Sequence, residues 1–280
     1  MTTVLVTGFS GLLAPYIVNR LKKEFFVVSS SRSSGNYLVD ITNVKQVKIM
    51  LNKVNPDVIV HCAALTDVDE AEKNPDLAFL INEKGTKNLV DSLKNDAHFI
   101  YISTDQVFPD NLGPHLEGTE KPINNYGMSK FKGSKIVENL IKKHTICQTN
   151  IFGPSINKTA KSFSDNIIKK LSNNENLNLF SDVYFSPLHL KSFSDIVAQL
   201  IKKNIYGKYN IGSRVGMSKK NFIIKIANHL NLSLKHTKTI KTKGIERKAK
   251  RAYDLRLDTT KIEEALNYKM PDLDKEILKL

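Results

Sequence analysis

A glycine-rich turn between a short apolar run and an amphipathic stretch constrains the fold of this chain most strongly. Residues 4–6 predict a buried strand, and a helix is expected from Ala14 to about Lys23. Gly8 and Gly11 allow a tight turn between them, and the helix N-terminus offers free N–H groups to a pyrophosphate. The turn therefore predicts a dinucleotide site, and a plain glycine turn without a ligand is the alternative. The residues of this site are Gly8, Phe9, Ser10, Gly11, Leu12 and Leu13.

The same alternation continues through the first half of the chain. Strands are expected at 4–6, 25–29, 58–62, 98–102 and 145–149, and helices near 44–54, 77–94 and 126–143. This rhythm predicts an α/β fold, a doubly wound parallel sheet (Rossmann) with its ligand at the carboxyl ends of the strands. Helices near 162–171, 193–203 and 218–230 indicate a smaller α/β substrate lobe. We predict an NAD(P)-binding domain at 1–150 and a substrate-binding lobe at 151–280, with some segments interleaved.

Composition favours a cytoplasmic globular protein. Hydrophobic residues make up 41% of the chain, yet no apolar stretch approaches the ~20 residues that span a bilayer. The first strand follows Met1 almost directly, with no charged leader. The two cysteines, Cys62 and Cys147, form neither a disulfide framework nor a metal site, and we expect both to be reduced and inert in buried strands.

The net charge of +14 raises the possibility of an anionic partner. About half of the excess lies in residues 235–251, which we interpret first as a solvated loop. Guiding a ligand that carries a diphosphate is the second interpretation, and nucleic-acid binding is the last. No aromatic residue interrupts this run, and no nucleic-acid-binding signature is present, so we expect no nucleic-acid partner.

Tyr126 and Lys130 lie one helical turn apart in the sequence Tyr-Gly-Met-Ser-Lys. The ordinary pKa of a tyrosine is about 10, and a neighbouring positive charge favours the phenolate. The pair is therefore a candidate proton donor that works near neutral pH. Taken alone, such a pair is more often a solvated helix face.

In combination, several segments resemble the extended short-chain dehydrogenase/reductase family, and specifically its dTDP-4-dehydrorhamnose reductase branch. The resemblance rests on the glycine turn and on residues 56–69, 82–89, 102–108 and 126–130, with weaker similarity at 150–154, 186–187 and 257–261. It implies an NADPH-dependent reductase of the C4 keto group of a nucleotide-activated deoxy sugar, which could act as a homodimer. An epimerase or dehydratase of nucleotide sugars and a catalytically silent NADP-binding regulatory subunit are the alternatives.

The resemblance also assigns the catalytic residues Thr104, Tyr126 and Lys130. Tyr126 would give a proton to the carbonyl oxygen while the nicotinamide delivers hydride to the carbon. Thr104 would polarise that oxygen, and Lys130 would stabilise the tyrosinate and bind the nicotinamide ribose. Asn82 is either a relay residue or a buried asparagine that binds backbone. His61 and His189 are better explained as structural histidines.

The choice of cofactor depends on the end of the second strand. Arg32, with Ser31 and Ser33, stands where NAD-binding folds usually have an acidic residue, so NADPH is preferred and NADH is possible. By resemblance, Asp40 and Ile41 would lie against the adenine. The small residues after the third predicted strand, Cys62, Ala63 and Ala64, would let the backbone approach the cofactor.

Substrate contacts are implied for Thr66, Asp105, Gln106, Asn150 and Ile151. Here the sequence departs from the family pattern, because Gln106 replaces a tyrosine, Gln148 an arginine and Ile151 a sugar-stacking tryptophan, and the chain contains no tryptophan at all. We therefore expect a different 4-keto sugar or a looser site.

Overall fold

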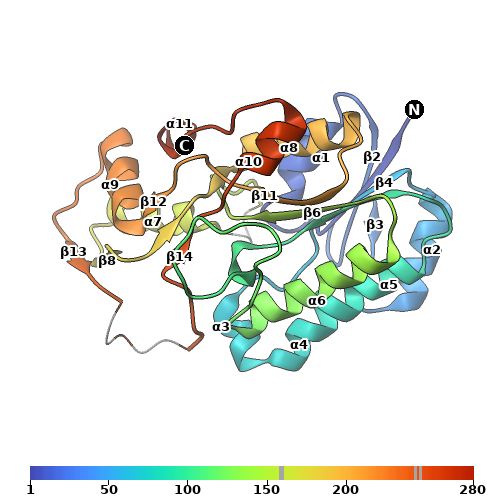
Figure 1. Cartoon of the computed structure of the whole chain (residues 1–280), viewed down its shortest axis with the longest axis horizontal. Coiled ribbons are helices and arrows are strands. Elements are labelled where there is room, and N and C mark those ends of the chain that lie inside the picture. The colour runs from blue at the N-terminus through green and yellow to red at the C-terminus, as the bar shows by residue number, and fades with distance from the viewer. Residues whose placement is uncertain (158–160, 243–244, 246–247) are drawn as a thin grey trace.

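The computed structural model describes residues 1–157, 161–242, 245 and 248–280. Its central sheet has the order β11-β6-β5-β4-β1-β2-β3, and every pair in it is parallel (Figure 1). The strands are β1 Thr3–Thr7, β2 Phe26–Ser31, β3 Tyr37–Leu38, β4 Val58–His61, β5 His98–Ile102, β6 His144–Thr149 and β11 Gly207–Ile211. The order reverses between β1 and β4, which opens a crevice at the carboxyl ends of these strands. The predicted doubly wound sheet is confirmed.

Helices cover both faces of the sheet, because strands and helices alternate along the chain. Helices α1 (Ala14–Leu21) and α8 (Leu190–Lys202) pack on one face, and α2 (Val44–Val54), α5 (Gly85–Asp91) and α6 (Asn125–Leu140) pack on the other (Figure 1). Their apolar stripes and the alternating strand residues form two separate cores. Ile262 and Leu266 of helix α10 (Thr260–Leu266) belong to the same core as α1 and α8.

The predicted helix at 77–94 is a composite of three segments. Helix α4 (Pro75–Phe79) runs into a π-helical turn at Leu80–Lys84 and then into α5. π-Helical turns are frequent at functional sites because they change the direction in which side chains point. A short helix before it, α3 (Val68–Lys73), was not predicted.

The second half has its own core around Phe152, Phe185 and Phe222. Its helices are α7 (Phe163–Ser172), α9 (Lys219–His229) and α11 (Leu273–Ile277). Its short strands are β7 Ile151–Phe152, β8 Leu177–Phe180, β9 Tyr184–Phe185, β10 Leu188–His189, β12 Met217–Ser218, β13 Thr237–Ile240 and β14 Asp254–Leu255. This half also supplies β11 and α8 to the first, as the expected interleaving requires, and the division at residue 150 stays a prediction.

Candidate active site

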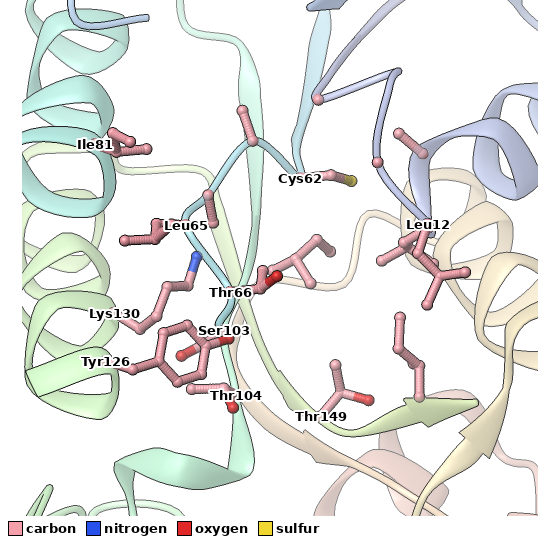
Figure 2. Close-up of a pocket in the computed structure, with 18 of the residues that line it drawn as sticks. Leu12, Cys62, Leu65, Thr66, Ile81, Ser103, Thr104, Tyr126, Lys130 and Thr149 are labelled. Carbon is pink, nitrogen blue, oxygen red and sulfur yellow. The ribbon is translucent and has the colours of Figure 1, made fainter. Parts of the chain in front are cut away.

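A cavity of about 520 Å³ opens at the carboxyl ends of the central strands (Figure 2). The glycine turn, the end of β2, the loop after β4, the end of β5 and α6 line it from the first half. Of the predicted site residues, those in the wall are Gly8, Ser10, Gly11, Leu12, Leu13, Ser31, Arg32, Asp40, Ile41, Cys62, Ala63, Ala64, Thr66, Thr104, Asp105, Gln106, Tyr126, Lys130, Asn150 and Ile151. The fold therefore brings the separate sequence motifs to one place.

The glycine turn can be built only with glycine at position 8. Gly8 has a φ of +77°, and a Cβ there would lie 2.7 Å from the backbone nitrogen of Ala63. This contact holds the turn against the loop after β4. Among the described residues, no side chain caps the N-terminus of α1 and no acidic residue stands in its first turn. Pro15 has no N–H and that of Tyr16 donates to Leu13 O at 3.0 Å, so the N–H groups that can meet an anionic ligand are those just before Pro15.

Phe9 is the one predicted cofactor residue that lies outside the cavity wall. Its ring packs against the core beneath α1 and α8, because an apolar ring at the start of the turn is better buried than exposed. Its backbone keeps a role in the turn. The amide of Asn157, from the second half, donates to the carbonyl oxygens of Phe9 at 3.1 Å and Gly11 at 3.0 Å.

Helix α6 presents Tyr126 and Lys130 to the cavity one turn apart, as Figure 2 shows. The helix starts at its N-cap Asn124, whose side chain accepts a bond from Gly127 N at 2.8 Å and donates to Gln106 Oε1 at 3.2 Å. A Cβ on Gly127 would lie 2.1 Å from the Gln106 carbonyl oxygen, so glycine lets the helix approach the end of β5. The turn after Tyr126 therefore packs directly against the segment that follows Thr104.

Burial dominates the protonation of this pair. Tyr126 is 8% and Lys130 2% exposed. Desolvation raises the pKa of Tyr126 to about 12, against an opposing hydrogen bond from Thr104, and it lowers the pKa of Lys130 to about 7. The Lys130 ammonium lies 4.2 Å from the centroid of the Tyr101 ring. The spacing of the pair led us to expect a Tyr126 pKa below its ordinary value, whereas desolvation, the largest effect on this group, raises that pKa.

Thr104 and Asp105 continue the site from the end of β5. The Thr104 hydroxyl accepts a bond from Gln106 N and donates to Asp105 Oδ1, both at 3.2 Å. Asn150 donates to the other oxygen of this carboxylate at 2.6 Å. Burial raises the pKa of the Asp105 carboxyl, against these hydrogen bonds. Burial thus shifts the pKa values of an acid, a phenol and an amine in one cavity, and such a group is typical of a catalytic site.

The end of β2 places Arg32 at the edge of the cavity with its side chain exposed. Ser31 is turned inward, because its hydroxyl donates to Ser34 O at 2.7 Å and accepts from Ser34 N at 3.0 Å. Asp40 caps the next turn by accepting bonds from the backbone and hydroxyl of Thr42, each at 2.8 Å. Arg32 is therefore the charged group that can meet a ligand phosphate at this end.

A buried polar network supports the loop after β4. Asn82, in the π-helical turn, bonds both the N–H and the carbonyl oxygen of Leu65, at 2.8 and 3.0 Å, and donates to Ser129 Oγ at 2.9 Å. Asn82 thus binds backbone, which was one of the two open interpretations. His61 bonds the hydroxyls of Thr7 at 2.7 Å and Thr86 at 3.1 Å, so it is a structural histidine as predicted.

His189 has its predicted structural role as well, since its Nδ1 accepts from Lys191 N at 3.2 Å and caps α8. Cys147 is buried as predicted. Cys62, however, follows β4 and lies half-buried in the cavity wall, so its placement in a buried strand was wrong. Burial raises the pKa of its thiol to about 12, which agrees with an inert cysteine.

Within the described residues, the second half also supplies Phe163, Phe185 and Lys219, which no sequence motif indicated, and Arg251, the last residue of the basic stretch 235–251. The Lys219 ammonium lies 5.2 and 5.9 Å from the ring centroids of Phe163 and Phe185. Arg251 pairs with Asp69 at 2.9 Å. Phe163 and Phe185 therefore bring aromatic rings to the cavity wall, although position 151 itself has none. No local pattern marks these residues, because only the tertiary fold brings them to the cavity.

The basic stretch 235–251 is also more ordered than expected. Residues 237–240 form β13, which pairs with β8, and the Lys250 carbonyl oxygen accepts a bond from Asn124 at 2.9 Å. Together with the ion pair of Arg251, this shows that the interpretation as a solvated loop is wrong for these parts. Lys243, Glu246 and Arg247 lie outside the described residues.

Gln148 does not belong to the cavity wall. It is buried in β6, and its amide donates to Glu120 Oε1 at 2.6 Å. The position to which the resemblance gives an arginine therefore lies outside the cavity wall.

Comparison with known proteins agrees with this geometry. The sequence matches the family described as RmlD substrate binding domain over residues 1–280. The chain belongs to this family. It is 28% identical to the dTDP-4-dehydrorhamnose reductase of Shigella flexneri, over 96% of this chain and 93% of the relative. It is 25% identical to the methionine adenosyltransferase 2 subunit beta of Xenopus tropicalis, over 92% and 81%.

Among solved structures, the dTDP-4-dehydrorhamnose reductase of Bacillus anthracis in complex with NADP superposes with a TM-score of 0.90. That protein is 27% identical, and the match covers 99% of this chain and 98% of the other. The predicted membership of the extended short-chain dehydrogenase/reductases, in the dTDP-4-dehydrorhamnose reductase branch, is confirmed.

Proposed function

We propose that the protein is an NADPH-dependent reductase of the C4 keto group of a nucleotide-activated deoxy sugar. The observation that carries this proposal is the meeting of Thr104, Tyr126 and Lys130 with the glycine turn and Arg32 in one cavity. A proton donor and a dinucleotide site are the two parts that a carbonyl reductase needs. Similarity to reductases of this kind supports the same activity.

The cavity suits a nicotinamide dinucleotide phosphate. The uncapped N-terminus of α1 and the Gly8 turn would hold its diphosphate, and Ala63 and Ala64 would allow close backbone approach. Arg32 would pair with the 2′-phosphate, while Asp40 and Ile41 would border the adenine. Bound there, the reduced cofactor supplies the hydride.

The protein's own groups would handle the proton. Tyr126 would donate its phenolic proton to the carbonyl oxygen as negative charge develops there, and Thr104 would donate a hydrogen bond to the same oxygen. Lys130, with its charge present below about pH 7, would stabilise the resulting tyrosinate. A Tyr126 pKa of about 12 keeps the proton in place until it is needed.

The substrate would lie between the two halves. The sugar would contact five residues of the cavity wall: Thr66, Asp105, Gln106, Asn150 and Ile151. Lys219 and Arg251 lie in the wall supplied by the second half, and they would pair with the diphosphate of the nucleotide. Residues 1–150 would then be the cofactor domain and 151–280 the substrate lobe.

Spectroscopy tests this function directly. The protein is mixed with NADPH and a panel of 4-keto nucleotide sugars, and the absorbance of the reduced nicotinamide is followed. Consumption of NADPH is expected with at least one sugar. Silence across the panel with tight NADP binding would instead indicate a regulatory subunit like the methionine adenosyltransferase relative. Silence with NAD retained through purification would indicate an epimerase or dehydratase.

We further propose a cytoplasmic enzyme that forms a homodimer and does not bind nucleic acid. In the described part of the chain, no helix is long and apolar enough to cross a membrane.

A further inference from the structure

The segment that leads into the catalytic helix is held by a strand from the other half of the chain. This lead-in segment, residues 115–124, ends at the N-cap of α6, two residues before Tyr126. Strand β11 contacts it three times. Asn210 N donates to Glu117 Oε1 at 2.7 Å, Asn210 Nδ2 donates to His115 O at 2.8 Å, and Lys208 Nζ lies 3.4 Å from Glu120 Oε1.

Lys208 supplies the charge in this contact. The Glu120 side chain is 4% exposed, so its carboxylate needs a positive partner. Gln148, on the neighbouring strand β6, gives it a neutral bond at 2.6 Å. Within the described residues, Lys208 is the cation that pairs with Glu120, and it also lies 3.2 Å from Glu138 Oε1 on α6 itself. Its own side chain is 11% exposed.

We propose that Lys208 is a positioning residue for the general acid, taking the place of a cation at position 148. The family resemblance leads us to expect an arginine at 148, and the Gln148 amide already reaches Glu120. Asn210 of β11 lies opposite Gln148 of β6 in the parallel register, so the two side chains that reach Glu120, Lys208 and Gln148, come from adjacent strands. By joining Glu120 to Glu138, Lys208 ties the lead-in segment to α6 and fixes Tyr126 relative to Thr104. This inference rests on the proposed reductase function.

Lys208→Met tests the role because it keeps the length of the side chain and removes the charge. We expect kcat to fall by about 10- to 100-fold, the loss typical of a misplaced catalytic group, while the affinity for NADPH changes little. The isotope effect with deuterated NADPH should rise, since the chemical step becomes slower. Lys202→Met is the matched control, because Lys202, on the same half as Lys208, forms a more exposed pair with Glu24 at 2.8 Å. It should leave kcat unchanged.

Two second-site changes distinguish a positioning role of Lys208 from a loss of folding in Lys208→Met. Gln148→Arg in the Lys208→Met background returns a cation to Glu120 and should restore kcat to within about threefold of the original. Glu120→Gln in the same background removes the unpaired carboxylate and should recover folding if Lys208→Met alone is insoluble. Unchanged turnover in Lys208→Met, or failure of both second-site changes to recover folding and turnover, would overturn the proposal.

Hydrogen exchange gives a readout that does not depend on turnover. Backbone amides of residues 115–131 should exchange faster in Lys208→Met and return to the original rate with Gln148→Arg. If the unaltered protein reduces no sugar but these rates change as expected, the proposed function fails and the positioning role survives. If it reduces a sugar and the rates stay unchanged, the positioning role fails alone.

Discussion

The two halves of the chain differ sharply in charge. Residues 1–150 contain 17 Lys and Arg against 16 Asp and Glu, whereas residues 151–280 contain 25 against 12. Nearly the whole excess of +14 therefore belongs to the half that carries Lys219 and Arg251. In the near-neutral half, the groups that can bind an anion in the cavity are the N-terminus of α1 and Arg32. In the basic half, they are the side chains of Lys219 and Arg251. The excess of positive charge therefore favours an anionic ligand on the side of the second half.

The halves also differ in what each contributes to the proposed active site. The first half holds the proposed catalytic groups, yet the second half supports them through Asn157 at the glycine turn and Lys208 at the lead-in segment. Changes in the first half should therefore alter chemistry or cofactor choice, and changes in the second half should alter substrate binding or geometry. The predictions below test that division.

The largest effect is expected for Tyr126→Phe in the first half. It removes the general acid, so kcat should fall by about 10²- to 10⁴-fold while the dissociation constant for NADPH changes by less than about threefold. Steady-state kinetics and NADPH fluorescence measure the two quantities. Normal turnover in this variant would remove Tyr126 from the reaction.

The next effect concerns the cofactor end of the same half. Arg32→Asp should lower kcat/KM for NADPH by about 100-fold and raise it for NADH, because an acid repels the 2′-phosphate and binds the ribose hydroxyls. Lys48→Asp is the control, since it makes the same change of charge at an exposed position of α2 outside the cavity wall. If the ratio of kcat/KM for NADPH to kcat/KM for NADH is the same before and after Arg32→Asp, Arg32 lies outside the cofactor site.

A smaller effect is expected in the basic half. Lys219→Ala and Arg251→Ala should each raise KM for the nucleotide sugar by about tenfold and leave NADPH affinity unchanged, because each removes one charge-assisted contact. Lys225, on the same helix as Lys219, pairs with Asp274 at 3.1 Å, and Lys225→Ala is the control. Weakened NADPH binding in the Lys219 variant would contradict the separation of the two ends of the cavity.

The smallest effect is a pH dependence of stability. Burial lowers the pKa of His61 to about 3, so the unfolded chain binds a proton below about pH 6.5 that the folded protein excludes. The free energy of unfolding should fall as pH drops, by about 2 kcal/mol between pH 6.5 and 5 from this residue. Urea denaturation at both pH values measures it. His61→Asn should reduce this slope without abolishing it, because burial also lowers the pKa values of His98 and His189 to about 4.

The sequence predicted the first half well because local signals decide it. The glycine turn, the apolar strands and the Tyr126–Lys130 spacing each carry their own structural reason. The family resemblance added Thr104, Asp40, Ile41 and the substrate contacts, and the fold brings twenty of the predicted site residues to one cavity. Phe9 failed because burial of a ring depends on neighbours that the local pattern does not show.

The basic half was harder to predict because its elements are short and its contacts are distant in sequence. Strands of two residues, such as β9 and β14, have no periodicity to detect. The pleat of β6 turns Gln148 toward Glu120 and away from the cavity, which the sequence pattern does not show. Lys219 lies in the cavity wall although no sequence motif marks it, whereas Arg251 belongs to the basic stretch whose second interpretation was guiding a diphosphate.

Transfer of isotope tests the central claim most directly. The protein is incubated with NADPH deuterated at the nicotinamide C4 and with the 4-keto nucleotide sugar that it consumes, and the product is analysed by NMR. Deuterium bound to C4 of the sugar, in one configuration, is the result that the account predicts. A product without deuterium, or with deuterium at another carbon, would contradict it.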